Sequence, residues 1–204
     1  MLNIAVLVSG GGTNLQALLD AQASGALGSG RIALVVSNKP AAYALTRAAQ
    51  AGVPCAVLEK RAGETPHAYG ERLLALLEQN RIHLVVLAGF LLILAENVVR
   101  AYAERIVNVH PSLIPSFCGE GFYGLRVHQA ALARGVKVTG ATVHLVNEVP
   151  DGGRILLQQA VPVLAGDTPE SLQRRVMEQA EWRILPEAVR LLVDGLTQQG
   201  YGEA

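Results

Sequence analysis

The 204-residue chain is poor in cysteine and carries no excess of either charge. Its two cysteines, Cys55 and Cys118, are too few for a disulfide framework, so the sequence predicts a protein of a reducing compartment. Seventeen Lys and Arg residues balance seventeen Asp and Glu residues. Because this balance implies no basic face, we expect no nucleic-acid partner.

Long hydrophobic runs and targeting segments are missing as well. The longest apolar run, Leu84–Ala95, has twelve residues, whereas a membrane-spanning helix needs about 20. The amino-terminal residues MLNIAVLVSGGG lack both the cationic lead and the small-residue cleavage site of a secretory signal. The sequence therefore predicts a cytoplasmic protein with no membrane partner.

What the chain does contain is an alternation of two patterns. Half of its residues are hydrophobic and 17% are charged, which allows a sizeable core. Short apolar runs, typical of strands covered on both faces, alternate with segments that have apolar residues at helical spacing. The runs are 3–9, 32–37, 53–58, 83–89 and 105–110, and the helical segments are 14–24, 42–52, 67–80 and 95–103. This alternation predicts an α/β fold with a mostly parallel, twisted sheet and helices on both faces.

The last third of the chain has a different pattern. Residues 139–147 and 153–163 read as longer strands separated by a turn-rich segment, which predicts antiparallel additions to the sheet. A final helical stretch from Pro169 to Gly195 is long enough to pack along the sheet. Repeats, low-complexity tracts and linkers are not evident, so we expect a single domain over residues 1–204.

A glycine loop joins the first predicted strand to the first predicted helix. Glycines 10–12 allow close backbone approach to a ligand, Thr13 or Asn14 can cap the helix, and the free N–H groups there form an anion site. A dinucleotide fingerprint would need a third glycine at Leu15 and an acidic residue near 37–40, and the Gly-Lys-Ser/Thr of a Walker loop is absent. A lone phosphate monoester fits best; the alternative is a tight turn without a ligand.

Three polar residues form the candidate catalytic set. Asn108 and His110 point to one face at the carboxyl end of a predicted strand, where open α/β sheets bind ligands. Asp151, in a glycine-rich turn, can reach across; next to an imidazole it would raise the pKa of the histidine. An Asn108 amide facing an oxyanion is worth about 3 kcal/mol. With no serine or cysteine in a nucleophile elbow, the set predicts acid–base chemistry on a substrate that brings its own nucleophile. The alternative is a capped strand end with a hydrogen-bonded histidine.

The remaining reactive side chains give weaker signals. His144 alternates with apolar residues and reads as a half-buried strand position, while His128 is expected at a helix start near the site. His67 and His83 read as surface or strand-edge residues, and no spacing resembles a metal site. We interpret Cys118 as an incidental loop cysteine rather than a reactive thiol.

Six segments together make the chain resemble the glycinamide ribonucleotide formyltransferases, which are folate-dependent. They are SGGGTNLQALLDA, SNKPAAYALTRAAQAGVP, VVLAGFLLIL, IVNVHPSLIPSF, GVKVTGATVHLV and DGGRILLQQAVPV, and they cover nearly the whole chain. The resemblance implies a Rossmann-like fold and formyl transfer from 10-formyltetrahydrofolate, as cosubstrate, to the amine of phosphoribosylglycinamide in purine biosynthesis. It implies small-molecule partners and no metal, and it allows a homodimer. Residues 1–104 would form the ribonucleotide-binding half and residues 105–204 the catalytic and folate-binding half.

The resemblance also implies residue roles. Asn108, His110 and Asp151 would be the catalytic residues. Phosphate would bind at Gly12, Thr13 and Asn14, and the ribose hydroxyls at Glu181. The folate pocket would be lined by Leu91, Leu92, Ile93, Leu94, Asn147, Glu148, Val149 and Pro150, together with Asn108 and Asp151.

Several positions depart from the pattern of the family. Leu92 stands where some members have arginine, no arginine for the folate tail lies near Pro66, and Trp182 replaces the usual histidine. The loop between Ser116 and Val127 is longer than in many members. These departures bear on the folate tail and the loop rather than on the catalytic residues.

Three rival functions share part of this pattern. A formyltetrahydrofolate deformylase would use the same catalytic residues with water as acceptor, although that class usually carries an additional amino-terminal domain. A methionyl-tRNA formyltransferase would need a carboxy-terminal RNA-binding domain and a basic surface. A phosphate-binding module without catalysis would explain the glycine loop but not the polar cluster.

Overall fold

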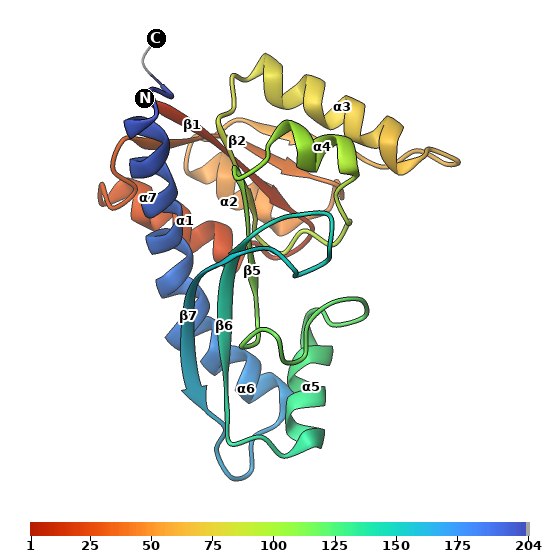
Figure 1. Cartoon of the computed structure of the whole chain (residues 1–204), viewed down its shortest axis with the longest axis vertical. Coiled ribbons are helices and arrows are strands. Elements are labelled where there is room, and N and C mark those ends of the chain that lie inside the picture. The colour runs from red at the N-terminus through yellow and green to blue at the C-terminus, as the bar shows by residue number, and fades with distance from the viewer. Residues whose placement is uncertain (203–204) are drawn as a thin grey trace.

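The computed structural model describes residues 1–202, which form one seven-stranded sheet with helices on both faces (Figure 1). The strands are β1 (Leu2–Val8), β2 (Gly30–Ser37), β3 (Cys55–Val57), β4 (Leu84–Leu87), β5 (Ile106–His110), β6 (Val138–Leu145) and β7 (Ile155–Pro162). Their order in the sheet is β3-β2-β1-β4-β5-β6-β7. Strands β1 to β5 are parallel, and β6 and β7 add to them in antiparallel fashion. This arrangement confirms the predicted fold class.

Seven α-helices and one π-helix surround the sheet. They are α1 (Thr13–Ala23), α2 (Tyr43–Gln50), α3 (Pro66–Gln79), α4 (Glu96–Ala101), α5 (Leu125–Arg134), α6 (Pro169–Val176), the π-helix (Met177–Glu181) and α7 (Trp182–Gln198). Side-chain caps begin two of them: Thr65 accepts a hydrogen bond from Ala68 N–H at the start of α3, and Thr168 and Ser171 form a capping box on α6. Within residues 1–202, no helix is both long enough and apolar enough to cross a membrane.

Strand β1 shows how the sequence divides its core between the two faces of the sheet. Ile4, Val6 and Val8 pack into the cluster under α1, α2, α5, α6 and α7. Ala5 and Leu7 pack into the opposite cluster under α3 and α4. All five side chains are at most 1% exposed. Burying one such aliphatic side chain contributes about 1.5–3 kcal/mol, so the apolar run is needed on both faces.

The order of the strands reverses between β1 and β4. The chain moves outward from β1 through β2 to β3, then returns to place β4 on the other side of β1. In open α/β sheets such a switch point leaves a crevice at the carboxyl ends of the strands. The glycine loop after β1 and the segment after β4 both begin there, and β5 ends beside them.

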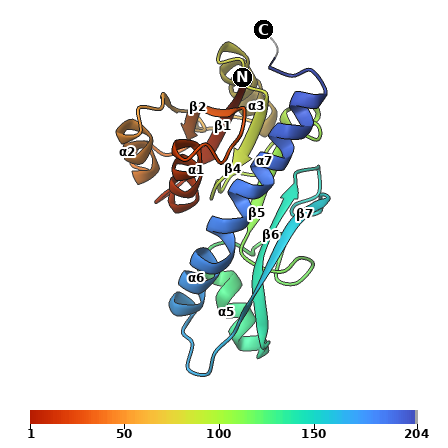
Figure 2. The same cartoon turned by 90° about the vertical axis from the view of Figure 1, so that its left-hand side faces the viewer.

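Two segments differ from their predicted form. The run 53–58 forms only a three-residue edge strand whose Cys55 and Val57 side chains are exposed, because no strand or helix covers the outer edge. The stretch from Pro169 is not one helix; the π-helix separates α6 from α7, which continues beyond Gly195 to Gln198. Figure 2 shows α6 beside α5 and the β6–β7 pair, with α7 running along the sheet.

Candidate active site

The carboxyl end of β5 presents the first two residues of the site. Asn108 is half-buried and His110 is 4% exposed. The antiparallel register of β6 places His144 opposite Asn108 and Thr142 opposite His110. The structure thus brings four polar side chains to one region of an otherwise apolar pair of strands.

A tight turn carries Asp151 to these residues. Asp151 has a φ of 54°, in the left-handed region, and the turn is held by Asn147, whose amide donates to Gly152 O and whose Oδ1 accepts from Val149 N–H. At Gly153 an added Cβ would lie 1.7 Å from the Leu145 carbonyl oxygen, so only glycine fits. The predicted glycine-rich turn is therefore a constraint on the path of the chain.

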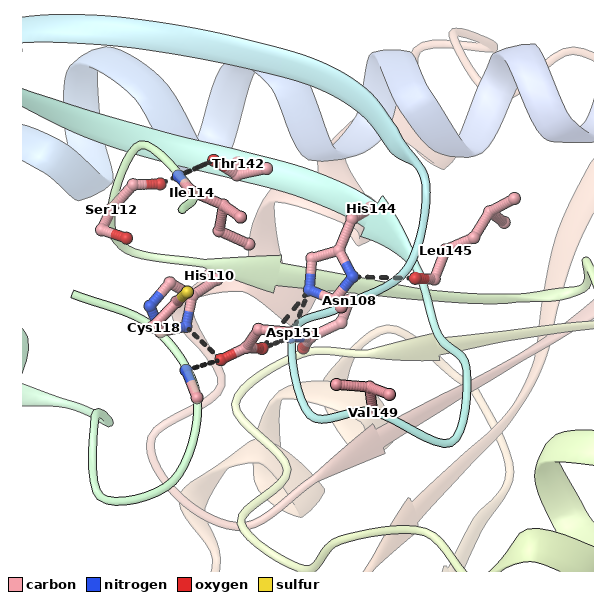
Figure 3. Close-up of polar contacts among 12 residues, drawn as sticks. Asn108, His110, Ser112, Ile114, Cys118, Thr142, His144, Leu145, Val149 and Asp151 are labelled. Carbon is pink, nitrogen blue, oxygen red and sulfur yellow. Dashed lines mark hydrogen bonds and ion pairs between the residues drawn. The ribbon is translucent and has the colours of Figure 1, made fainter. Parts of the chain in front are cut away.

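The Asp151 carboxylate lies close to four nitrogen atoms, three of them on the side chains of His110, His144 and Asn108, which Figure 3 labels. Its Oδ2 accepts a hydrogen bond of 2.8 Å from Gly119 N–H and lies 3.5 Å from His110 Nδ1. Its Oδ1 lies 3.4 Å from His144 Nε2 and 3.5 Å from Asn108 Nδ2. The three predicted catalytic residues therefore meet in space.

Sequence reasoning missed the part played by His144. The residue is 1% exposed instead of half-buried, and its Nε2 lies 3.2 Å from Asn108 Nδ2. Its Nδ1 donates to the Leu145 carbonyl oxygen at 2.8 Å, which leaves Nε2 facing Asn108 and Asp151. The signal was available in the sequence only through the strand register, since His144 lies opposite Asn108 once β5 and β6 pair.

Burial and neighbouring charges have opposite effects on the pKa values of His110 and Asp151. Burial lowers the pKa of His110 and outweighs the opposite effect of Asp151 and of the Phe117 carbonyl. Asp151 does raise the pKa of His110, as expected. The net pKa of His110 is nevertheless lowered, which differs from the expectation. Burial alone would raise the pKa of Asp151, but hydrogen bonds from His144 and Gly119, with the charge of His110, bring it below its usual value.

The loop between β5 and α5, residues 111–124, covers this cluster. The Phe117 carbonyl oxygen lies 2.8 Å from His110 Nε2. Since a carbonyl only accepts, Nε2 carries the proton. Together with the bond from Gly119 N–H to Asp151, this contact ties the loop backbone to two of the three catalytic candidates. Cys118, between them, is a free and partly exposed cysteine.

Two adjoining cavities flank the cluster. A cavity of about 140 Å³ includes Leu92–Leu94, Asn108, His144 and residues 146–151 in its lining, and one of about 600 Å³ includes Gly89–Ile93, Asn108–Pro111, residues 119–124, Pro150 and Asp151. Every residue assigned to the folate pocket lines at least one of them. The walls combine apolar side chains with several polar and charged groups, which can orient a small molecule. Leu92 lines both cavities, so the side chain that stands in place of arginine faces this space.

The glycine loop lies at the carboxyl end of β1, which β4 separates from β5 in the sheet. Gly12, in the left-handed region at a φ of 72°, begins α1, and no side chain caps it. The expectation that Thr13 or Asn14 caps the helix is therefore wrong. Thr13 Oγ1 lies 3.9 Å from Met177 Sδ, and Asn14 Nδ2 donates to the Glu181 carboxylate at 2.6 Å.

Glu181 is the buried acid that Asn14 contacts. Its carboxyl is 6% exposed, and burial raises its pKa to about 6 even though Asn14 Nδ2 stabilises the charged form. A cavity of about 320 Å³ is lined by residues that include Thr13, Arg47 and Trp182, the last of which follows Glu181 in the chain. The structure thus joins Asn14 and Glu181, which are 167 positions apart in sequence.

Ser9 connects the glycine loop to the 88–94 segment. Its Oγ accepts a hydrogen bond from Leu91 N–H and donates one to Asn38 Oδ1, and its N–H donates to the Gly89 carbonyl. The glycine loop and the 88–94 segment therefore lie side by side at the switch point. Pro66, where no arginine is present, is the first residue of α3.

Within residues 1–202, no group of three or more His, Cys, Asp or Glu side chains is arranged to hold a metal ion. The fold and the cluster define an open α/β protein with a group of ionisable and polar side chains at the carboxyl end of β5, near its switch point. Residues 2–189 match the Formyl transferase family model, and the chain belongs to that family.

Related proteins and structures agree with this assignment. A phosphoribosylglycinamide formyltransferase from Haemophilus influenzae is 40% identical over 96% of this chain and 89% of its own. The human trifunctional purine biosynthetic protein adenosine-3 is 42% identical over 97% of this chain. The chain spans only 19% of that protein. Glycinamide ribonucleotide transformylase 1 from Symbiobacterium toebii matches with a TM-score of 0.89 and 44% identity, covering 96% of this chain and 89% of that one.

Proposed function

We propose that the protein is a cytoplasmic phosphoribosylglycinamide formyltransferase of purine biosynthesis. It transfers the formyl group of 10-formyltetrahydrofolate to the glycinamide amine and releases tetrahydrofolate. The observation that carries the proposal is the cluster of Asn108, His110 and Asp151 in the lining of the cavity of about 600 Å³, at the same edge of the sheet as the glycine loop. Relatives that bear this name span nearly the whole chain.

In this proposal each of the two sites, the one at the glycine loop and the one beside Asp151, holds one of the two substrates. The phosphate of the ribonucleotide binds the backbone N–H groups of Gly12, Thr13 and Asn14, and its ribose hydroxyls bind Glu181. The folate lies against Leu91–Leu94 and residues 147–151, with its formyl group toward Asn108. Residues 1–204 act as one domain, and the partners are small molecules. The proposal is compatible with a homodimer.

The substrate supplies the nucleophile, so the protein supplies position, charge stabilisation and proton transfer. The glycinamide amine attacks the formyl carbon, and negative charge develops on the formyl oxygen. His110 Nε2–H and an Asn108 amide N–H stabilise that charge once the Phe117 carbonyl has been displaced. Holding two substrates together contributes several kcal/mol more.

Asp151 controls the second proton of His110. Burial lowers the pKa of His110 and so favours the neutral imidazole. Negative charge on the formyl oxygen then favours uptake of a solvent proton at His110 Nδ1, which Asp151 stabilises and which returns to solvent when the tetrahedral intermediate collapses. The carboxylate also accepts a proton from the attacking amine, directly or through water, on its way to the leaving folate nitrogen.

The proposal is tested by mixing purified protein with 10-formyltetrahydrofolate and following tetrahydrofolate release. We expect release to depend on added phosphoribosylglycinamide. Release at the same rate without the ribonucleotide would instead identify a deformylase. That alternative is carried by a formyltetrahydrofolate deformylase structure from Pseudomonas syringae, which matches with a TM-score of 0.84 and 27% identity.

A further inference from the structure

His128 is a buried imidazole that the proposed mechanism leaves without a task. It lies on α5, four residues after Gly124, and is 0% exposed. Neither Nδ1 nor Nε2 has a hydrogen-bond partner. A buried polar group without a partner costs about 1–3 kcal/mol, which an aliphatic or phenyl side chain would avoid. Such a residue therefore calls for a reason beyond the stability of this conformation.

His128 lies close in the chain to the loop 111–124, which contacts two of the candidate catalytic residues. It belongs to the buried face of α5, with Val127 and Ala131, and α5 follows directly on the loop 111–124. Burial, and to a lesser degree the nearby His110, lower the pKa of His128 to about 4. The imidazole is thus neutral near pH 7, with one nitrogen ready to donate and the other ready to accept.

In the proposed reaction the Phe117 carbonyl of this loop loses the hydrogen bond that it now accepts from His110. Phe117 O is held by His110 Nε2 at 2.8 Å, and this contact occupies the nitrogen that the reaction needs. Gly119 N–H likewise occupies Asp151 Oδ2. The Phe117 side chain packs against the core cluster under α5 and α6, so the carbonyl stays in a partly buried region when His110 turns to the substrate. A partly buried carbonyl needs another donor.

We propose that His128 is a positioning residue that takes over a backbone carbonyl of the 116–119 segment when substrates displace that segment from His110. In the structure His110 Nε2 donates to the Phe117 carbonyl and the His128 ring has no partner; in the substrate-bound loop His128 donates to that carbonyl and His110 Nε2 is free. The unsatisfied imidazole thus lowers the cost of releasing the catalytic pair. The inference rests on the proposed formyl transfer.

Variants at His128 separate this role from a purely structural one. His128→Phe keeps a ring and removes both nitrogens, while His128→Asn and His128→Gln restore a donor near Nδ1 and Nε2 respectively. We expect His128→Phe to keep or raise Tm and to lower kcat about tenfold, the effect of one lost hydrogen bond. At least one amide variant should recover most of the activity. The pH profile should keep its midpoint, because His128 is neutral throughout. Gln129→Ala, on the exposed face of α5, is the matched control.

A measurement on the wild-type protein keeps the test decisive if His128→Phe does not fold. Ring-nitrogen NMR of ¹⁵N-histidine-labelled protein should show His128 as an unbonded neutral imidazole without ligands. Adding phosphoribosylglycinamide with tetrahydrofolate, a pair that cannot react, should move one nitrogen to a hydrogen-bonded shift. An unchanged His128 spectrum, or a folded His128→Phe variant with kcat within twofold of the wild type, would overturn the inference. Absence of ribonucleotide-dependent turnover in the wild type would instead reject the proposed function.

Discussion

At the scale of single residues, the catalytic cluster is organised around one carboxylate. Asp151 faces His110, His144 and Asn108 while Gly119 N–H binds its other side. Its charge is therefore the main force that opposes the desolvation of His110. Removing this charge without changing the shape of the side chain tests how much the imidazole depends on it.

We predict that Asp151→Asn lowers kcat and shifts the pH profile to lower pH. Asp151 raises the pKa of His110 against the effect of burial, so its loss lowers that pKa further. The protonated imidazole disappears as pH rises through the folded-state pKa, and in the variant this happens at lower pH. Profiles of kcat against pH for the wild type and the variant give the measurement.

The coupled action of the pair has its own control. His110→Ala should lose far more activity than Asp151→Asn, and the double variant should lose little more than His110→Ala alone, because residues that act as one unit are not additive. Fully additive losses, or an unshifted profile in Asp151→Asn, would show that the two side chains act independently.

Glu181 gives a second prediction, on stability and binding together. Its folded-state pKa of about 6 lies above the reference value of 4.5, so folding is penalised when the carboxylate is charged. We predict that Glu181→Gln stabilises the protein by about 2 kcal/mol at pH 8. The gain should shrink as pH falls through about 6 and vanish below 4.5.

The same variant should bind the ribonucleotide less tightly, since an amide accepts hydrogen bonds from hydroxyls less strongly than a carboxylate. We expect a higher KM for the ribonucleotide and an unchanged KM for the folate. Glu178→Gln, an exposed acid on the same π-helix, is the control. A pH-independent change in Tm for Glu181→Gln would contradict the buried-charge account.

At the scale of elements, the start of α1 contains glycines with different tasks. A Cβ at Gly12 would lie 2.6 Å from Ala44 Cβ on α2, so this glycine allows two helices to approach. Gly11 has open space at the Cβ position, and its φ is not in the left-handed region. The two positions therefore separate packing from ligand access.

We predict that Gly11→Val raises the KM for the ribonucleotide at least tenfold with little change in Tm, because the side chain enters the space in front of the helix N-terminus. Gly12→Val should lower Tm as well, through the clash with α2 and the left-handed φ. Steady-state kinetics and thermal unfolding of both variants test this. An unchanged KM in folded Gly11→Val would remove the phosphate from this loop.

How far the sequence predicts these elements depends on how local their causes are. Apolar runs and helical spacing are local, and they give β1, β2, β4 and β5 correctly and place the ends of α1 and α2 within two residues. The exposed β3 edge and the π-helix depend on what packs beside them. Local sequence patterns do not contain that information.

The same distinction holds in the site. Asn108 and His110 are predictable because they share one strand, and Asp151 because its turn requires glycine. His144 depends on the register of β6, and His128 on the absence of partners in the folded core. The net fall in the pKa of His110 depends on burial by the loop, which the sequence does not reveal.

At the scale of the whole molecule, the chain brings the two proposed ligand sites together at one switch point. The glycine loop and Glu181 form one, residues 88–94 and the Asp151 turn form the other, and Ser9 bonds link the loop to the 88–94 segment. The catalytic cluster adjoins the second site at the end of β5. This arrangement suits a transfer between two bound molecules better than hydrolysis of one.

The destination of the formyl group tests this claim most directly. With 10-formyltetrahydrofolate labelled with ¹³C in the formyl group, and with phosphoribosylglycinamide present, carbon NMR of the reaction follows the label. We predict that the label appears as an N-formyl amide on the ribonucleotide, in equal amount to the tetrahydrofolate released. Label that accumulates as formate while the ribonucleotide stays unmodified would contradict the account.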